Sequence, residues 1–168
     1  MRNVLLRKFP LRIAAIDAAI VTLALLLPTV LHALGAGVRF LEPMRLALLA
    51  AVIFVPERKN AYLVAVALPW ISCAIVGMPV MWKAAMMSAE LAINVFLLYK
   101  LTDLKLHPGL AALLSIIVSK ALYYVAKFLL IRFAVLPQTA VIENIPAIFI
   151  SVILLTVLFI CGTKMMKR

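Results

Sequence analysis

Apolar residues form long runs along this chain, and short polar stretches separate the runs. A helix needs about 20 mostly apolar residues to cross the hydrocarbon core of a bilayer. Six segments approach that length, at residues 11–31, 42–56, 61–77, 84–100, 109–132 and 144–163. The pattern therefore predicts an all-α membrane protein, a compact bundle of six transmembrane helices in which residues 1–168 form a single integral membrane domain.

The second segment is shorter than the others. Between Arg45 and Glu57 only eleven residues lack charge, which corresponds to about 16 Å of helix at 1.5 Å per residue. Arg45 must therefore extend its side chain toward water or face a wet protein interior. Such a helix is expected inside the bundle.

Composition and cysteine usage agree with a membrane protein. Charged residues make up 14% of the chain and the mean hydropathy is +1.20, whereas ordinary soluble domains carry about 25% charged residues. Cys73 and Cys161 lie in separate apolar segments, so they indicate neither a disulfide framework nor a metal site. The basic start is typical of a signal peptide, but the apolar run continues too far and no small-residue cleavage site follows it. We therefore expect a retained first helix.

The distribution of basic residues predicts the orientation, because cytoplasmic loops collect Lys and Arg. With both termini inside, eleven of the seventeen basic residues lie on the cytoplasmic side and four on the outer side, while Lys120 and Lys127 fall within the fifth segment. We therefore expect both termini in the cytoplasm and an even number of helices. The net charge of +11 then reflects topology and contact with anionic membrane lipid, and nothing indicates binding to nucleic acid.

Ionisable residues in the fifth segment need an explanation, since a charge at the bilayer centre costs roughly 2.5–3.5 kcal/mol on insertion scales. Lys120, Tyr123, Tyr124 and Lys127 lie along one helical face. In a purely structural reading, Lys127 extends outward and Lys120 pairs with a buried carboxylate. In the functional reading, at least one of the two lysines contacts a ligand.

The fourth segment carries Glu90 and Asn94 one helical turn apart. If the fourth and fifth helices are antiparallel, Glu90 lies at a depth comparable to Lys127, and an ion pair of Glu90 with Lys127 or Lys120 needs no ligand. The amide of Asn94 can donate and accept. It suits a neutral polar ligand, and it suits an interhelical hydrogen bond equally.

The first segment contains two overlapping pairs of small residues four positions apart, a spacing that lets another helix approach closely. These residues are Ala14, Ala15, Ala18 and Ala19. Alanine is common in membrane helices, so the spacing alone indicates little. Asp17 lies among them near the inner third of the helix, where we expect it to pair with Arg12 or another basic residue.

Three loops open to the outer side. The first contains Pro28, Gly35, Gly37 and Pro43, which interrupt helices. Its polar residues are His32, Arg39, Glu42 and Arg45. The second, "IVGMPVMWK", places Trp82 at interface height, and the third, "VLPQTAVIEN", ends at Asn144. The inner loops are short and basic, so the outer face is expected to collect a ligand and the inner face to meet lipid or a partner.

Together these residues resemble the substrate-binding S-components of energy-coupling factor vitamin transporters, which are small six-helix proteins with both ends inside. The matched elements lie in residues 14–98 and are, in order, Pro28, His32 and Gly35, "LEPM" with Pro43 and Met44, Pro69 with Ser72, "GMP" at 77–79, and Glu90. The last two helices match only in type. Where many such proteins have a Gly-Pro then Gly turn after the second helix, this chain has "VPERKN".

The resemblance implies a subunit of a bacterial or archaeal cytoplasmic membrane that has no ATPase of its own. It would bind a vitamin or related micronutrient from outside and dock, through the four alanines of the first helix, on a transmembrane coupling subunit driven by two ATPases. Toppling of the whole subunit is the family's proposed transport step. The ligand would lie near the outer ends of helices four to six, with residues 32–45 closing over it.

The candidate substrate-binding residues that combine both lines of argument are His32, Arg39, Glu42, Trp82, Glu90, Asn94, Tyr123, Tyr124, Lys127 and Asn144. The aromatic residues and mixed charges suit several vitamins, including riboflavin, folate, pantothenate or a corrinoid, and do not rank them.

Two other classes stay open. A rod-shape scaffold of the MreD type resembles this fold in size and helix number, acts as a partner in cell-wall assembly, and needs no polar pocket. An enzyme is the other class, but the six carboxylates, His32 and His107 form no evident catalytic constellation, and the chain has no Gly-rich phosphate loop or Cys/His metal spacing. We therefore expect no enzymatic activity, no cofactor and no metal.

Overall fold

The computed structural model describes residues 14–27, 42–55, 57–77, 79–133 and 145–166. Helix Ala14–Leu27 comes first. It is followed by α2 (Pro43–Phe54), α3 (Arg58–Val76), α4 (Met81–Asp103), α5 (Pro108–Arg132) and α6 (Ile145–Met166). The expected all-α class is confirmed for the described residues, and each of the six predicted segments overlaps one of these helices, although α3, α4, α5 and α6 extend beyond the predicted bounds.

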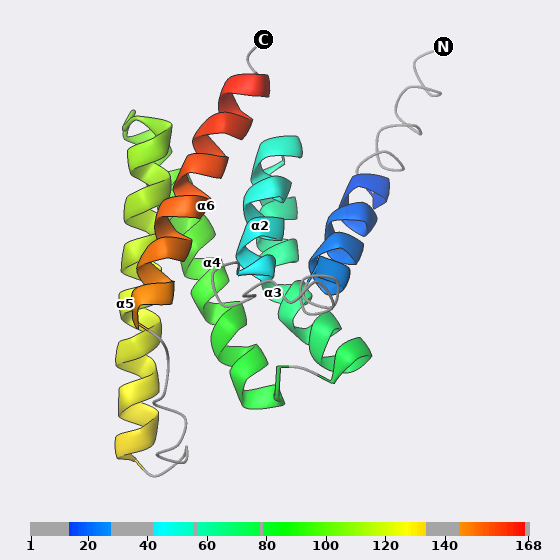
Figure 1. Ribbon diagram of the computed structural model, residues 1–168, viewed down its shortest axis with the longest axis vertical. Helices are drawn as coiled ribbons and strands as arrows, with labels where there is room; N and C mark the ends of the chain where they lie inside the picture. The colour runs from blue at the N-terminus through cyan, green and yellow to red at the C-terminus, as the bar shows by residue number, and fades with distance from the viewer. Residues whose placement is uncertain (1–13, 28–41, 56, 78, 134–144, 167–168) are drawn as a thin grey trace.

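Successive helices run antiparallel in a bundle (Figure 1). Each helix from α2 to α6 contacts the next one, and α2 also contacts α6. Helix Ala14–Leu27 begins, and α6 ends, at the same end of the bundle, which we call the terminal end (Figure 1). An even number of antiparallel helices requires this arrangement. That the terminal end faces the cytoplasm stays a prediction.

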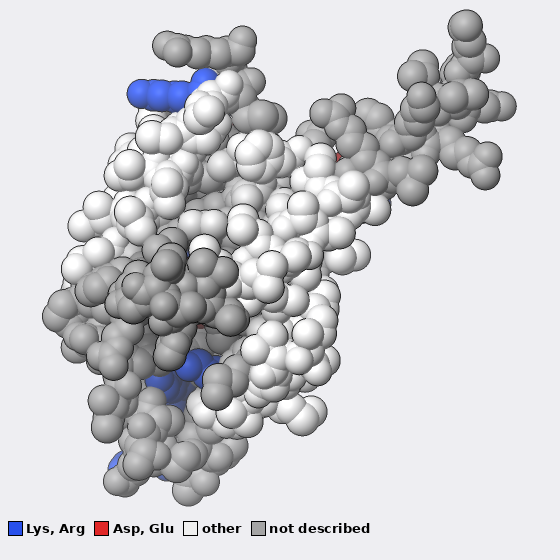
Figure 2. All heavy atoms as spheres, turned by 45° about the vertical axis from the view of Figure 1, so that its right-hand side comes forward, with Lys and Arg blue, Asp and Glu red and all other residues white. Residues whose placement is uncertain are grey.

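The outer surface of the described helices is largely apolar. The helices α3, α4 and α5 are long and apolar enough to cross a membrane, and the shorter stretches Ala14–Leu27, Pro43–Phe54 and Phe149–Met165 are apolar as well. In the face drawn in Figure 2 the described surface is mostly uncharged, and Lys and Arg atoms gather only near the C-terminus and low on the face. A continuous apolar surface of this kind indicates a membrane protein; that all six helices span the bilayer stays a prediction.

The short helix α2 lies at the centre of the packing. One buried apolar cluster joins its Leu48 to Ile20 of the first helix and to residues of α3 and α4. A second cluster joins Leu49, also of α2, to Ile116 of α5 and Leu155 of α6. Because both clusters meet at α2, the expectation that this helix lies inside the bundle is confirmed.

Proline and glycine set several helix ends. Pro43 and Pro108 stand in the first turns of α2 and α5, where a missing backbone N–H costs no hydrogen bond. Gly77 ends α3 with a φ of 74°, a left-handed conformation that glycine adopts without a Cβ clash. The predicted turn after the third helix is therefore confirmed at Gly77. Pro43, which we expected to break helix continuity at the end of the first outer loop, stands in the first turn of the helix predicted to start at residue 42.

Candidate functional site

A cavity of about 360 Å³ lies at the first turn of α2. The helix has 12 residues, about 18 Å at 1.5 Å per residue, whereas α5 has 25 residues, about 37 Å. Since α2 extends toward the terminal end, its first turn lies well inside the bundle (Figure 1). The described residues that line the cavity are Glu42, Pro43, Met44, Arg45, Lys83, Met87, Glu90, Leu91, Lys120 and Tyr123. The volume is within the range of small-molecule sites, about 300–1,000 Å³.

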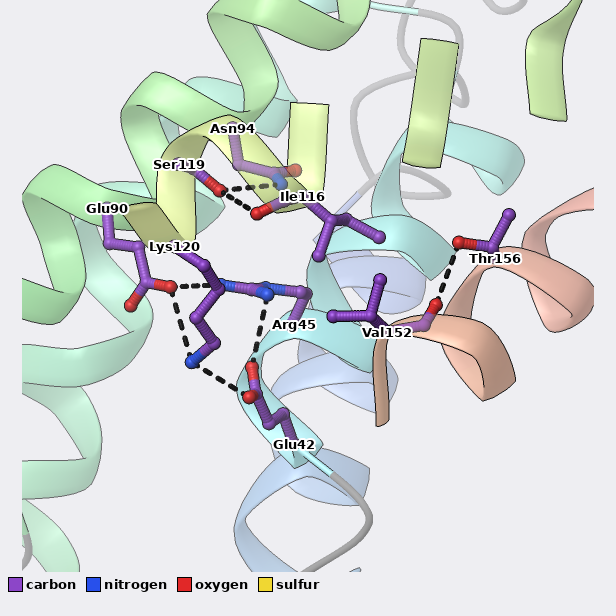
Figure 3. Close-up of polar contacts among 9 residues, drawn as sticks. All are labelled: Glu42, Arg45, Glu90, Asn94, Ile116, Ser119, Lys120, Val152 and Thr156. Carbon is purple, nitrogen blue, oxygen red and sulfur yellow. Dashed lines mark hydrogen bonds and ion pairs between the residues drawn. The ribbon is translucent and has the colours of Figure 1, made fainter. Parts of the chain in front are cut away.

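Four charged side chains of this lining form one network, which we call the charged cluster. It consists of Glu42, Arg45, Glu90 and Lys120. Arg45 Nη2 donates to Glu90 Oε1, and Arg45 Nη1 lies 3.3 Å from Glu42 Oε2. Lys120 Nζ lies 2.8 Å from Glu42 Oε1 and 3.4 Å from Glu90 Oε1. Each cation therefore contacts both carboxylates (Figure 3).

Local helical geometry brings these side chains together. Glu42 occupies the N-cap position of α2 without a capping hydrogen bond from its side chain, and it is three residues before Arg45, so the two side chains lie on the same face. A carboxylate at a helix N-terminus is also stabilised by the helix dipole. Glu90 and Lys120 reach the same point from the facing sides of α4 and α5, whose contact aligns them with the start of α2.

The cluster is almost completely removed from solvent at its centre. The exposed fractions of the Arg45 and Glu90 side chains are 1% and 5%. Moving a charge out of water costs several kcal/mol unless pairing and hydrogen bonds compensate. In the described part of the chain, Arg45 Nε and Nη1 are buried without a hydrogen-bond partner. Arg45 is thus ion-paired yet retains donors that are not satisfied.

The predicted lysine and tyrosine face of α5 is present in the structure. Lys120 Nζ lies 5.6 Å from the ring centroid of Tyr123, and Lys127 Nζ lies 5.8 Å from the same centroid. Lys127 is also 5.9 Å from the ring of Tyr124 and is buried. These distances suit cation–π attraction, so the aromatic rings stabilise two cations of α5, a helix long and apolar enough to cross a membrane. Of the two lysines, Lys120 is the one that pairs with Glu90.

Asn94 lies one turn beyond Glu90 and is fully buried. Its Nδ2 donates to Ser119 Oγ of α5 over 3.2 Å, and Ser119 Oγ donates to the Ile116 carbonyl (Figure 3). Asn94 is not among the residues that line the cavity. Of the two roles considered from the sequence, the structure shows the interhelical hydrogen bond.

The structure brings some predicted site residues together and not others. Glu42, Glu90 and Tyr123 line the cavity. Trp82 lies half-buried in the first turn of α4 and is not part of the described lining. Tyr124 and Lys127 adjoin the site through Tyr123. The candidates that lie outside the described residues are His32, Arg39 and Asn144.

The position of Arg45 shows that the expectation of a loop over residues 32–45 is wrong at its end. The end of the expected covering loop, from Pro43 to Arg45, belongs to α2, and Arg45 is buried. The sequence predicted that Arg45 needs water or a polar interior, but it did not predict Arg45 at the centre of the site. Met44, Met87 and Leu91 of the lining were not among the predicted site residues either. Met87 lies three positions before Glu90 and therefore on the same helical face, whereas Met44 and Leu91 are only sequence neighbours of Arg45 and Glu90.

The alanines predicted to dock a partner are all exposed, on the side of the first helix away from the buried Ile20 and Ala24. Among the described residues, Asn60 Nδ2 of α3 donates to Asp17 Oδ1 over 2.7 Å. Arg12 lies outside the described residues, so its pairing with Asp17 stays a prediction.

Within the described ranges, no group of three or more His, Cys, Asp or Glu side chains is placed to hold a metal ion. Comparisons of the chain with protein-family models, curated proteins and solved structures gave no match. The resemblance to S-components therefore depends on the sequence elements quoted for it.

Proposed function

We propose that this chain is the substrate-binding subunit of an energy-coupling factor type importer. It captures a vitamin or related micronutrient from outside and delivers it through a coupling subunit and two ATPases. The observation that carries the proposal is the cavity beside the charged cluster, at a depth where the surrounding helices are apolar. Such intramembrane ionisable groups commonly mark substrate pathways.

The location of the cavity supports uptake from outside. The charged residues that line it lie at the start of α2, in the first turn and near the middle of α4, and at the middle of α5. Because α4 begins at the end of the bundle away from the terminal end (Figure 1), the cavity extends from the middle of the bundle toward that end. The bias of basic residues assigns the terminal end to the cytoplasm. Under that orientation the cavity lies toward the outer face, where a binding subunit meets its substrate.

Stability alone is a weak reason for the charged cluster. Replacing a buried ion pair by well-packed apolar residues is often neutral or stabilising. A bundle that only needed to hold α2, α4 and α5 together has apolar residues available for that purpose, as at Leu49 and Ile116. Retaining four charges beside an open volume fits a ligand site better.

The proposed partners follow from the two surfaces of the molecule. The exposed alanines allow close approach of a coupling-subunit helix. The apolar side chains of α3, α4 and α5 face membrane lipid. The ATPases would act through the coupling subunit and not through this chain.

An MreD-like scaffold is the second candidate, and one observation favours it. The members of the charged cluster pair with one another, so the cluster can join three helices without any ligand. A scaffold would use the same bundle to contact other proteins of a cell-wall assembly complex.

Mass spectrometry distinguishes these functions. The protein is expressed with candidate vitamins supplied, purified in detergent and denatured, and the released small molecules are quantified. A vitamin-like compound at about one per protein supports the binding subunit and identifies its substrate. Release of phospholipid alone would contradict the transport proposal and favour the scaffold.

A further inference from the structure

We infer that the cavity selects a ligand with one anionic group, a carboxylate or a phosphate, attached to an apolar body. This inference rests on the proposed function for the source of the ligand, a soluble micronutrient, and it adds the substrate class. It is carried by the charge balance of the described lining, by the hydrogen-bonding state of Arg45 and by the distribution of apolar side chains.

The described lining carries three cations and two carboxylates. Glu42 and Glu90 each contact both Arg45 and Lys120. Lys83, the third cation, has no carboxylate of a described residue within ion-pair distance. One positive charge of the lining is therefore left without a compensating anion from the described residues, and it lies on the first turn of α4 at the cavity wall.

Arg45 adds hydrogen-bond donors to this wall. Its Nε is buried and has no hydrogen-bond acceptor in the described part of the chain, and its Nη1, 3.3 Å from Glu42 Oε2, forms an ion pair there but no hydrogen bond. A guanidinium donates and cannot accept, and the same is true of the ammonium of Lys83. A ligand group that completes this wall must therefore supply acceptors, and an anion supplies them while compensating the excess charge.

The rest of the cavity is suited to an apolar body. Met44, Met87 and Leu91 line it together with the ring of Tyr123. Methionine side chains are flexible and polarisable, so they adapt to irregular ligands. A fully charged or sugar-like ligand would leave polar groups against these side chains, whereas a compact apolar body would not.

The test compares ligands that differ only in the acidic group. Wild-type protein in detergent is titrated with pantothenate and pantothenol, with nicotinate and nicotinamide, and with any compound released on denaturation beside its methyl ester or amide. Vesicles of phosphatidylglycerol and of phosphatidylcholine provide a separate lipid arm. Binding is measured by thermal unfolding and by equilibrium titration on wild-type protein, Lys83→Gln, Lys83→Arg and Lys59→Gln.

Lys59→Gln is the matched control, because Lys59 is an exposed lysine in the first turn of α3, away from the cavity. We expect at least one acid to bind and its neutral counterpart to bind at least tenfold more weakly. Lys83→Gln should weaken binding of the acid about 10- to 100-fold, as expected for loss of one charge-assisted contact. Lys83→Arg should stay within a few-fold of wild type, and Lys59→Gln should be unchanged.

The failures of the two proposals are distinguishable. A neutral vitamin that binds as tightly as any acid overturns the anion preference and leaves the transport function standing. Binding of phosphatidylglycerol alone, weakened by Lys83→Gln, upholds the anion site and overturns transport. If no acid binds in either arm, or if Lys83→Gln binds the acid like wild type, the inference is wrong.

Discussion

Two arginine–carboxylate pairs of this molecule join residues 45 positions apart, and their surroundings differ completely. Arg45 and Glu90 pair inside the bundle with exposed fractions of 1% and 5%. Arg58 and Asp103 pair at the terminal end with exposed fractions of 56% and 53%. In the exposed pair, Arg58 Nη1 donates to Asp103 Oδ2 over 2.8 Å and Arg58 Nη2 donates to Asp103 Oδ1 over 2.5 Å.

The same chemical pair therefore has different energetic consequences at different depths. The exposed pair has good bidentate geometry and packs Arg58 over the ring of Tyr99, but exposed ion pairs contribute only about 0–1 kcal/mol. The buried pair depends on every partner, because a lone buried charge costs several kcal/mol. Arg45 and Glu90 line the cavity at the start of α2, so the buried pair is the one we associate with function.

The largest expected effect follows removal of Glu90. Glu90→Leu leaves Arg45 buried with Glu42 as its remaining carboxylate, and it should lower the free energy of unfolding by about 3–5 kcal/mol. Reversible denaturation in mixed detergent micelles measures this change. The double variant Arg45→Met with Glu90→Leu should recover more than half of the loss. A single variant within about 1 kcal/mol of wild type would show that the buried pair is no more demanding than the exposed one.

The next largest effect is expected at the alanine face of the first helix, where a substitution should affect transport but not ligand binding. Ala18→Leu adds bulk on the exposed alanine face near Asp17, and it should reduce transport at least tenfold while ligand affinity stays within twofold of wild type. Uptake in cells that express the coupling module and binding to the purified protein measure the two quantities. Ala121→Leu, at an exposed position of α5, is the matched control. Equal loss of transport and binding in Ala18→Leu would identify a folding contact instead of a docking face.

A smaller effect is expected at Asn94. Asn94→Leu removes the hydrogen bond to Ser119 and should cost about 1 kcal/mol of stability, with ligand affinity unchanged. Ser119→Ala should lose a similar amount. If Asn94→Leu instead weakens ligand binding tenfold without loss of stability, Asn94 contacts the ligand, as the sequence alone allowed.

The smallest effect is expected at the exposed pair. Asp103→Asn should change the free energy of unfolding by less than about 1 kcal/mol, because water and salt screen this site. The same denaturation assay as for Glu90→Leu measures it. A loss as large as that of Glu90→Leu would remove the distinction between the two regions.

The sequence predicted the helices because each apolar run is long and bounded by charge, proline or glycine. It also predicted the interior position of α2, because Arg45 and Glu57 leave too short an apolar stretch between them. The charged cluster was predicted only in part. Helical spacing relates Lys120 to Tyr123, but it carries no information on which helices touch, and the ion pair of Arg45 with Glu90 depends on the contact of α2 with α4. Asn94 shows the same limit, since its amide suits a ligand and a neighbouring serine equally well.

The central claim is that the cavity at the start of α2 is a ligand site. An experimental structure of the protein purified with its own bound molecule tests this claim most directly. We expect one ordered small molecule between Lys83 and Tyr123, with its acidic group at hydrogen-bond distance, about 2.7–3.2 Å, from Lys83 Nζ. A cavity filled by side chains of this chain or by a lipid acyl chain, with the charged cluster intact, would contradict it.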